Sequence, residues 1–199
     1  MENPLAGVTV AVFGSSEPRE GSGEYEVARR IGGMLAGAGA RVASGGYGGV
    51  MEAASRGCVE AGGATIGITC SLFAARSPNT WLTEVREGAD LFERTRLLID
   101  ESDAFIILPG KSGTLAELAF LWALDRAGAL GGKPIVLCGT AWRTIVDAIE
   151  SAGALEPAQR LITSLESDPG KAVAILVRRI AERREGPGSR PAAREPDGT

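Results

Sequence analysis

The sequence of 199 residues contains no histidine. This absence excludes Ser-His-Asp and Cys-His catalysis, metal sites built on histidine and any imidazole general base. Catalysis by this chain must therefore use carboxylates, arginine, lysine, hydroxyls, thiols or backbone dipoles.

Cysteine is scarce, with only Cys58, Cys70 and Cys138. They are odd in number, widely spaced and set among apolar residues. A disulfide framework and a zinc motif are both disfavoured by this pattern. We expect three buried thiols that pack as small hydrophobic side chains.

Long hydrophobic runs and an excess of positive charge are also missing. No apolar stretch reaches the roughly 18 residues that a membrane-spanning helix needs, and the start, MENPLAGVTVAVFG, lacks the basic region of a signal peptide. The net charge of −4 argues against general nucleic-acid binding. We therefore expect a cytoplasmic protein without membrane or nucleic-acid partners.

The residues that are present have the composition of a globular domain, with 44% hydrophobic and 23% charged residues. We expect one Rossmann-like nucleotide-phosphate-binding domain over residues 1–184. Residues 185–199 are rich in Gly, Pro, Arg and Glu and predict a disordered tail.

Short apolar runs alternate with stretches of helical periodicity. This order predicts an α/β fold with a single doubly wound, mainly parallel sheet and helices on both faces. The predicted strands are Val8–Phe13, Arg41–Ser44, Thr65–Ile68, Thr83–Val85, Ala104–Leu108, Pro134–Leu137 and Leu161–Ser164. The predicted helices are Glu24–Ala38, Val50–Ala61, Leu91–Glu101, Leu115–Ala127, Trp142–Ala152 and Pro169–Arg184.

Three predicted strand ends carry turns rich in glycine or hydroxyl groups, and ligands of such sheets bind at the carboxyl ends of strands. Glycine lets the backbone approach a ligand, and a helix N-terminus offers free N–H groups to a phosphate. These turns supply the predicted phosphate or ligand-binding residues, namely Gly14, Ser15, Gly45, Gly46, Gly48, Gly49, Gly110, Lys111, Ser112, Gly113 and Thr114. A purely structural alternative for the last turn is a tight turn with Thr114 as the helix N-cap.

Two charged residues near these turns have open roles on pattern alone. Glu117 either completes a capping box with Thr114 or places a carboxylate beside the phosphate turn. Arg94 and Arg96 are either solvated or directed at an anion. Cys70–Thr80 is expected to be an irregular loop and a candidate lid.

With these residues in view, the chain resembles the LOG family of cytokinin-activating nucleotide phosphoribohydrolases over roughly Val8–Ile180. The resemblance rests on VAVFGSS, GGYGGVMEAASRGCVEAGG, FERTRLLIDESDAFIILPG and PGKSGTLAEL. It implies cleavage of a purine or cytokinin nucleoside 5′-monophosphate to free base and ribose 5-phosphate, with Arg94 and Glu117 as catalytic residues. It also implies a homodimer, a small phosphorylated ligand as partner and no metal or other cofactor.

The sequence departs from the family pattern at two positions. Lys111 replaces the second glycine of the phosphate turn, and Thr95 replaces the lysine that follows the catalytic arginine. A related branch is similar to molybdenum-cofactor carrier proteins, so the alternative is a non-catalytic carrier or sensor of a phosphorylated ligand. A lysine decarboxylase is disfavoured, because no lysine lies in a recognisable Schiff-base context.

Overall fold

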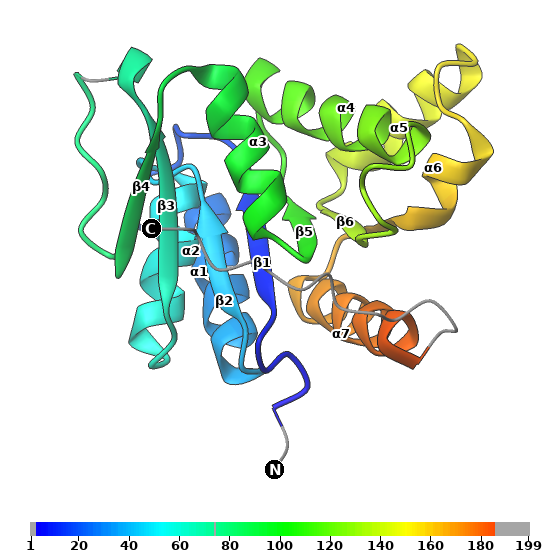
Figure 1. The fold of residues 1–199 in the computed structure, drawn as a ribbon. Coiled ribbons are helices and arrows are strands. Elements are labelled where there is room, and N and C mark those ends of the chain that lie inside the picture. Colours follow the sequence, from blue (N-terminus) through cyan, green and yellow to red (C-terminus); the bar gives the residue numbers. More distant parts are fainter. Residues whose placement is uncertain (1–2, 74, 186–199) are drawn as a thin grey trace, which may run out of the picture.

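The predicted apolar runs form the strands of one seven-stranded sheet in the computed structural model, which describes residues 3–73 and 75–185 (Figure 1). Every pairing in the sheet is parallel, so the expectation of a mainly parallel sheet is confirmed in a stricter form. The strands are β1 (Thr9–Phe13), β2 (Arg41–Ser44), β3 (Thr65–Cys70), β4 (Glu84–Gly88), β5 (Ala104–Ile107), β6 (Ile135–Cys138) and β7 (Thr163–Glu166).

The strand order is β4-β3-β2-β1-β5-β6-β7. The direction of progression reverses between β1 and β5, and a doubly wound sheet opens a crevice at the carboxyl ends of the strands at such a point. The fold therefore places a candidate site at the ends of β1 and β5.

Helices cover both faces of the sheet because side chains alternate along each buried strand. Val10 and Val12 face a core formed with α1 (Gly23–Gly37), α2 (Val50–Glu60) and α7 (Pro169–Glu185). Ala11 and Phe13 face the opposite core, formed with α3 (Leu91–Glu101), α4 (Ser112–Arg126) and α5 (Ala141–Ser151).

Two glycines bring α1 and α2 into close contact. A β-carbon at Gly32 would lie 2.0 Å from the Ala54 carbonyl oxygen, and one at Gly57 would lie 1.8 Å from that of Arg29. Larger residues at either position would separate the two helices, so these glycines determine how closely the helices pack.

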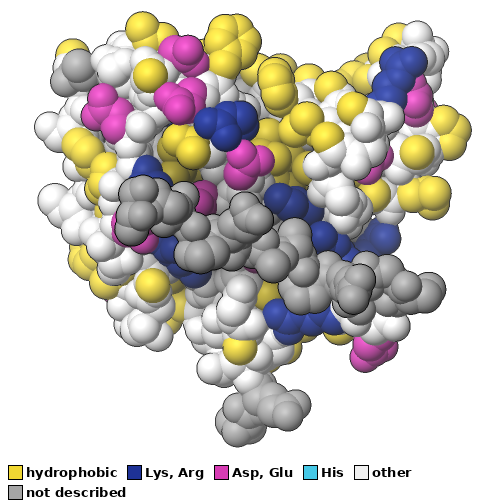
Figure 2. All heavy atoms as spheres, viewed as in Figure 1, with side chains coloured by type: hydrophobic (Ala, Val, Ile, Leu, Met, Phe, Trp, Pro, Cys, Tyr) yellow, Lys and Arg dark blue, Asp and Glu magenta, His cyan; other side chains and the backbone are white. Residues whose placement is uncertain are grey.

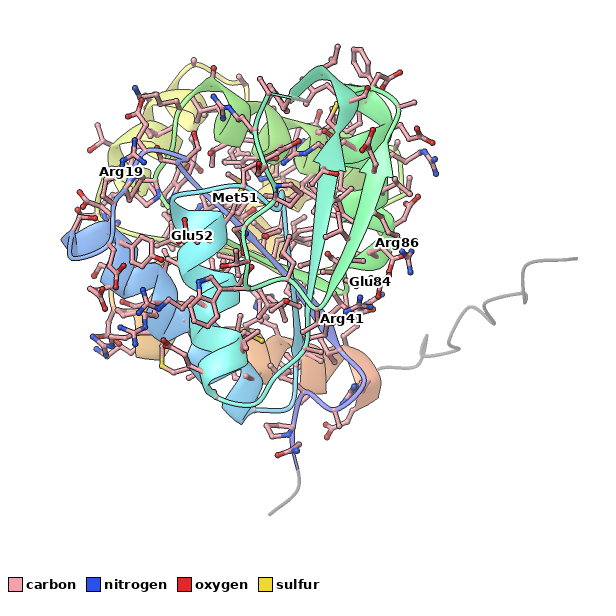
Figure 3. The ribbon with its side chains drawn as sticks, turned by 90° about the vertical axis from the view of Figure 1, so that its left-hand side faces the viewer. Arg19, Arg41, Met51, Glu52, Glu84 and Arg86 are labelled. Carbon is pink, nitrogen blue, oxygen red and sulfur yellow. The ribbon has the colours of Figure 1, made fainter. Side chains whose placement is uncertain are left out.

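The outer strand β4 carries charged side chains at the edge of the sheet. Arg41 forms an ion pair with Glu84, and Arg86 Nε lies 2.8 Å from the other carboxylate oxygen of Glu84 (Figure 3). Charges on an edge strand oppose pairing with the sheet of another molecule.

The structure corrects several predicted boundaries. α4 begins at Ser112, three residues before the prediction, and β4 extends to Gly88. A helix that was not predicted, α6 (Pro157–Ile162), starts with a capping box between Glu156 and Gln159 and displaces β7 toward the C-terminus. Its six residues are too few to produce a clear helical periodicity.

The C-terminal helix α7 runs to Glu185, which is the first residue of the predicted tail; residues 186–199, the rest of that prediction, lie outside the described residues. None of the helices described in the structure has both the length and the apolar character needed to cross a bilayer.

Candidate active site

The three turns singled out in the sequence meet at one end of the sheet. They line a cavity of about 500 Å³ at the carboxyl ends of β1 and β5. Ser15 N donates a hydrogen bond of 3.3 Å to the Pro109 carbonyl, and Val50 N donates one of 2.9 Å to the Ser15 carbonyl. The first turn is thus connected by backbone hydrogen bonds to both of the others.

The turn between β5 and α4 presents a helix N-terminus to this cavity. Lys111 is the N-cap and its side chain makes no capping hydrogen bond, whereas Thr114 lies within the first turn of α4. The prediction of Thr114 as N-cap is therefore wrong, because the helix starts earlier than its apolar periodicity indicates. Thr114 is only 4% exposed and lines the cavity.

Gly110 allows this turn to close over Thr114. A β-carbon at Gly110 would lie 2.1 Å from Thr114 Oγ1 and 3.0 Å from Ser15 N. The glycine is thus required for close packing within the turn, and Gly110 itself does not line the cavity.

Gly45 leaves space for a neighbouring arginine. A β-carbon at Gly45 would lie 1.8 Å from Arg94 Nη2 and 2.7 Å from Met51 Sδ. The sequence predicted that this glycine lets the backbone approach a ligand, but the structure shows an additional role in making room for the Arg94 guanidinium.

Arg94 and Glu117 come together in the cavity from α3 and α4. Arg94 Nη1 lies 3.4 Å from Glu117 Oε1, and Arg94 Nε donates a hydrogen bond of 2.9 Å to the Ile68 carbonyl. The two side chains are 8% and 15% exposed. Arg94 is therefore not solvated, which was one of the two alternatives for it. Arg96, in contrast, lies on the surface and pairs with Glu93 and Asp100.

Burial raises the pKa of Glu117 above the usual glutamate value, because the low-dielectric surroundings disfavour the carboxylate. The adjacent Arg94 guanidinium lowers the same pKa and so offsets part of the increase. A carboxyl group with a raised pKa that faces a cation in a cleft is a typical candidate for acid–base or electrostatic catalysis.

The capping-box alternative for Glu117 is wrong. α4 starts at Ser112, so Glu117 stands at its sixth residue, and the side chain contacts Arg94. A capping box requires a residue in the third position of the helix.

The departures from the family pattern have visible consequences. The side chain of Lys111 is 73% exposed, and its Nζ lies 2.5 Å from Glu17 Oε1, across the mouth of the cavity. Thr95 is buried and its hydroxyl donates to the Leu91 carbonyl within α3. The lysine thus adds a charge at the rim, and the threonine adds none.

The sequence-predicted residues divide into two groups. Those that line the cavity are Gly14, Ser15, Gly45, Arg94, Lys111, Ser112, Gly113, Thr114 and Glu117. Gly46, Gly48, Gly49 and Gly110 do not line it. Gly49 adopts a φ of +71°, and a β-carbon there would lie 2.5 Å from the Ser15 carbonyl oxygen, so its role is to fit the second turn against the first.

Sequence reasoning missed a largely apolar end of the cavity. Met51 contributes from the first turn of α2 (Figure 3), together with Tyr47, Phe73 and Arg76. The signal for Phe73 and Arg76 was an aromatic residue and an arginine in the stretch identified as a candidate lid.

The three buried thiols of Cys58, Cys70 and Cys138 are unpaired, as predicted.

A family model described as the SLOG cluster4 family (LDcluster4) matches residues 7–162. The chain is 35% identical over 131 residues to a cytokinin riboside 5′-monophosphate phosphoribohydrolase of Mycobacterium tuberculosis, with 65% of this chain and 69% of that protein covered. It is 30% identical over 160 residues to a protein of the same name from Rhodococcoides fascians, with 76% and 80% covered.

Among solved structures, the molybdenum cofactor binding protein of Rippkaea orientalis aligns with a TM-score of 0.68. The two chains are 23% identical, and the alignment covers 87% of this chain and 97% of the other. At this identity, the similarity shows a common fold.

Proposed function

Since the chain belongs to the SLOG cluster4 family, we propose that it is a nucleotide phosphoribohydrolase, which cleaves the N-glycosidic bond of a purine or cytokinin nucleoside 5′-monophosphate. The observation that carries this proposal is the contact of Glu117 with Arg94 inside the cavity, one turn along α4 from a helix N-terminus.

The start of α4 is the proposed 5′-phosphate site. The first N–H groups of a helix have no acceptor within the helix, and the positive end of its dipole favours an anion. Here these groups belong to Ser112, Gly113 and Thr114, which all line the cavity. The buried Thr114 hydroxyl adds a further donor.

Glu117 is the proposed catalytic carboxylate. A water molecule attacks C1′ of the ribose, the bond between C1′ and the base nitrogen breaks, and its electron pair leaves with the base, which takes a proton. Glu117 accepts a proton from the attacking water and stabilises positive charge on the ribose. Arg94 favours the ionised form of Glu117 and fixes its position, because the guanidinium is itself held by the Ile68 carbonyl.

The test is the release of free base from AMP and from isopentenyladenine riboside monophosphate, followed by chromatography. We expect Glu117→Gln to reduce kcat by about 100-fold or more, since that is the usual contribution of a positioned acid–base group. Glu87→Gln is the matched control, because Glu87 is exposed on β4 and does not line the cavity. Base release that survives in Glu117→Gln contradicts the assignment.

A second candidate function is supported by Lys111. A carrier or sensor of a phosphorylated ligand such as molybdenum cofactor requires anion capture without cleavage, and the exposed Lys111 supplies a charge at the cavity mouth. The absence of bound pterin in protein recovered from cells, together with no affinity for the cofactor, would exclude this function.

We also propose that the protein acts as a homodimer. Large apolar side chains are exposed on α3 and α4, including Phe92 at 77%, Leu91 at 45% and Phe120 at 42%. Figure 2 shows hydrophobic side chains gathered over these two helices. Contiguous exposed apolar surface of this kind is typical of an interface with a partner.

A further inference from the structure

The end of the cavity away from α4 has the character of a base-binding pocket. A series of contacts leads there, from Glu117 to Arg94 and then past Gly45 to Met51. With the phosphate at α4 and the ribose at Glu117, the base falls at this end. The lining residues that we assign to this end are Tyr47, Met51, Phe73 and Arg76.

Arg76 is the charged residue among these four. Its guanidinium lies over the Phe73 ring, with the central carbon 5.5 Å from the ring centroid, and Phe73 packs edge-on against Tyr47 at 5.7 Å. Stacking on an aromatic ring fixes the plane of a guanidinium and leaves its N–H donors free at the rim. Within residues 3–73 and 75–185, no carboxylate forms an ion pair with Arg76.

The side-chain acceptors near this pocket are already engaged. The Tyr47 hydroxyl accepts from Cys70 N at 3.0 Å and donates to the Cys70 carbonyl at 3.2 Å. The two carboxylates that line the cavity, Glu17 and Glu117, contact Lys111 and Arg94 respectively. The pocket therefore offers the base the hydrogen-bond donors of Arg76, and its one hydroxyl group, that of Tyr47, is bound to the backbone of Cys70.

These donors distinguish between purines. A 6-oxopurine presents two acceptors on one edge, O6 and N7, and arginine binds them with two parallel hydrogen bonds. A 6-aminopurine presents one acceptor and one donor on the same edge, and its amino group meets the guanidinium donors unfavourably. Building on the proposed function, we propose that the base is a 6-oxopurine and that Arg76 is the residue that selects it.

The test compares GMP and IMP with AMP as substrates and as ligands. We expect the wild-type kcat/KM for GMP and IMP to exceed that for AMP by about 5- to 150-fold, as expected for one bidentate pair. Arg76→Met retains an apolar side chain against Phe73 and loses the donors, so we expect it to remove this preference. Arg76→Lys retains the charge without the planar pair of donors, and we expect it not to restore the preference.

Arg143→Met is the matched control, since Arg143 is exposed on α5 and does not line the cavity. Affinities for the same three nucleotides are measured by calorimetry in the Glu117→Gln background, which separates selection of the base from cleavage. Cleavage without a preference for 6-oxopurines, or an equal loss for all nucleotides in Arg76→Met, overturns the role of Arg76 and leaves the hydrolase proposal intact. Selective binding that depends on Arg76, without cleavage, supports the inference and overturns the hydrolase. Failure to bind any of the three overturns both.

Discussion

Replacing Gly45 with alanine tests whether the position of Arg94 is fixed by this glycine. Gly45 does not have a positive φ, so alanine introduces no backbone strain there. Its β-carbon, however, would lie 1.8 Å from Arg94 Nη2. Arg94 is buried and anchored to the Ile68 carbonyl, so the guanidinium must leave this position.

The cost of this displacement follows from the contacts that are lost. A hydrogen bond from a charged donor contributes about 1.5–3 kcal/mol to the free energy of unfolding. We therefore expect Gly45→Ala to lower Tm by about 3–12 °C in a protein of this size. The displaced guanidinium also leaves Glu117, and misplacement of catalytic groups by about 1 Å reduces rates by about 100-fold.

The assay combines thermal unfolding with base release from a nucleoside 5′-monophosphate. Gly48→Ala is the matched control in the same loop, because a β-carbon there would meet only Glu52 Oε2, at 3.7 Å, and its φ is not positive. We expect Gly48→Ala to retain both stability and activity. If Gly45→Ala behaves like Gly48→Ala, Arg94 does not depend on the space at Gly45 and the reasoning is refuted.

Three further outcomes are expected. Glu117 has a raised pKa in the folded protein, so its contribution to stability is full below the unfolded-state pKa and is lost as pH rises through the folded-state pKa. Denaturant unfolding at several pH values should therefore show that Glu117→Gln gains stability relative to the wild type as pH rises. A difference that stays constant with pH contradicts this. Burial raises the pKa of Cys58 and Cys138 to about 11, so both thiols should react with a thiol reagent at pH 8 only when the protein unfolds, and rapid labelling of the native protein would refute their burial. Light scattering should find a dimer for the wild type and a monomer for Phe92→Glu, and a wild-type monomer contradicts the proposed interface.

Much of the fold was predictable because the strong signals are local. Apolar runs such as that in β5 are buried on both faces, and Gly39 follows α1 with a φ of +91°, as a C-terminal glycine should. The two elements that were predicted wrongly also have local explanations. α6 has only six residues, and the N-terminus of α4 depends on hydrogen bonds that apolar periodicity does not report.

For the candidate site, the sequence predicted the location of the cavity but not the role of each glycine. Glycine-rich turns after strands indicated the end of the sheet where the cavity lies, because the carboxyl ends of parallel strands share one edge. Which glycines line the cavity did not follow from their spacing. Gly49 and Gly110 serve contacts between loops, and Gly45 accommodates an arginine from a helix almost fifty positions away.

By itself, the sequence determined the fold class, the absence of imidazole chemistry and the turns that border the cavity, because composition and short-range periodicity carry these properties. The tertiary structure decided that Arg94 is buried beside Glu117 and that Arg76 lies over the Phe73 ring in the lining of the cavity. These contacts join separate helices, strands and loops. The surroundings of a side chain shift its pKa and decide which of its hydrogen-bond donors stay unpaired, and these surroundings exist only after the elements have packed.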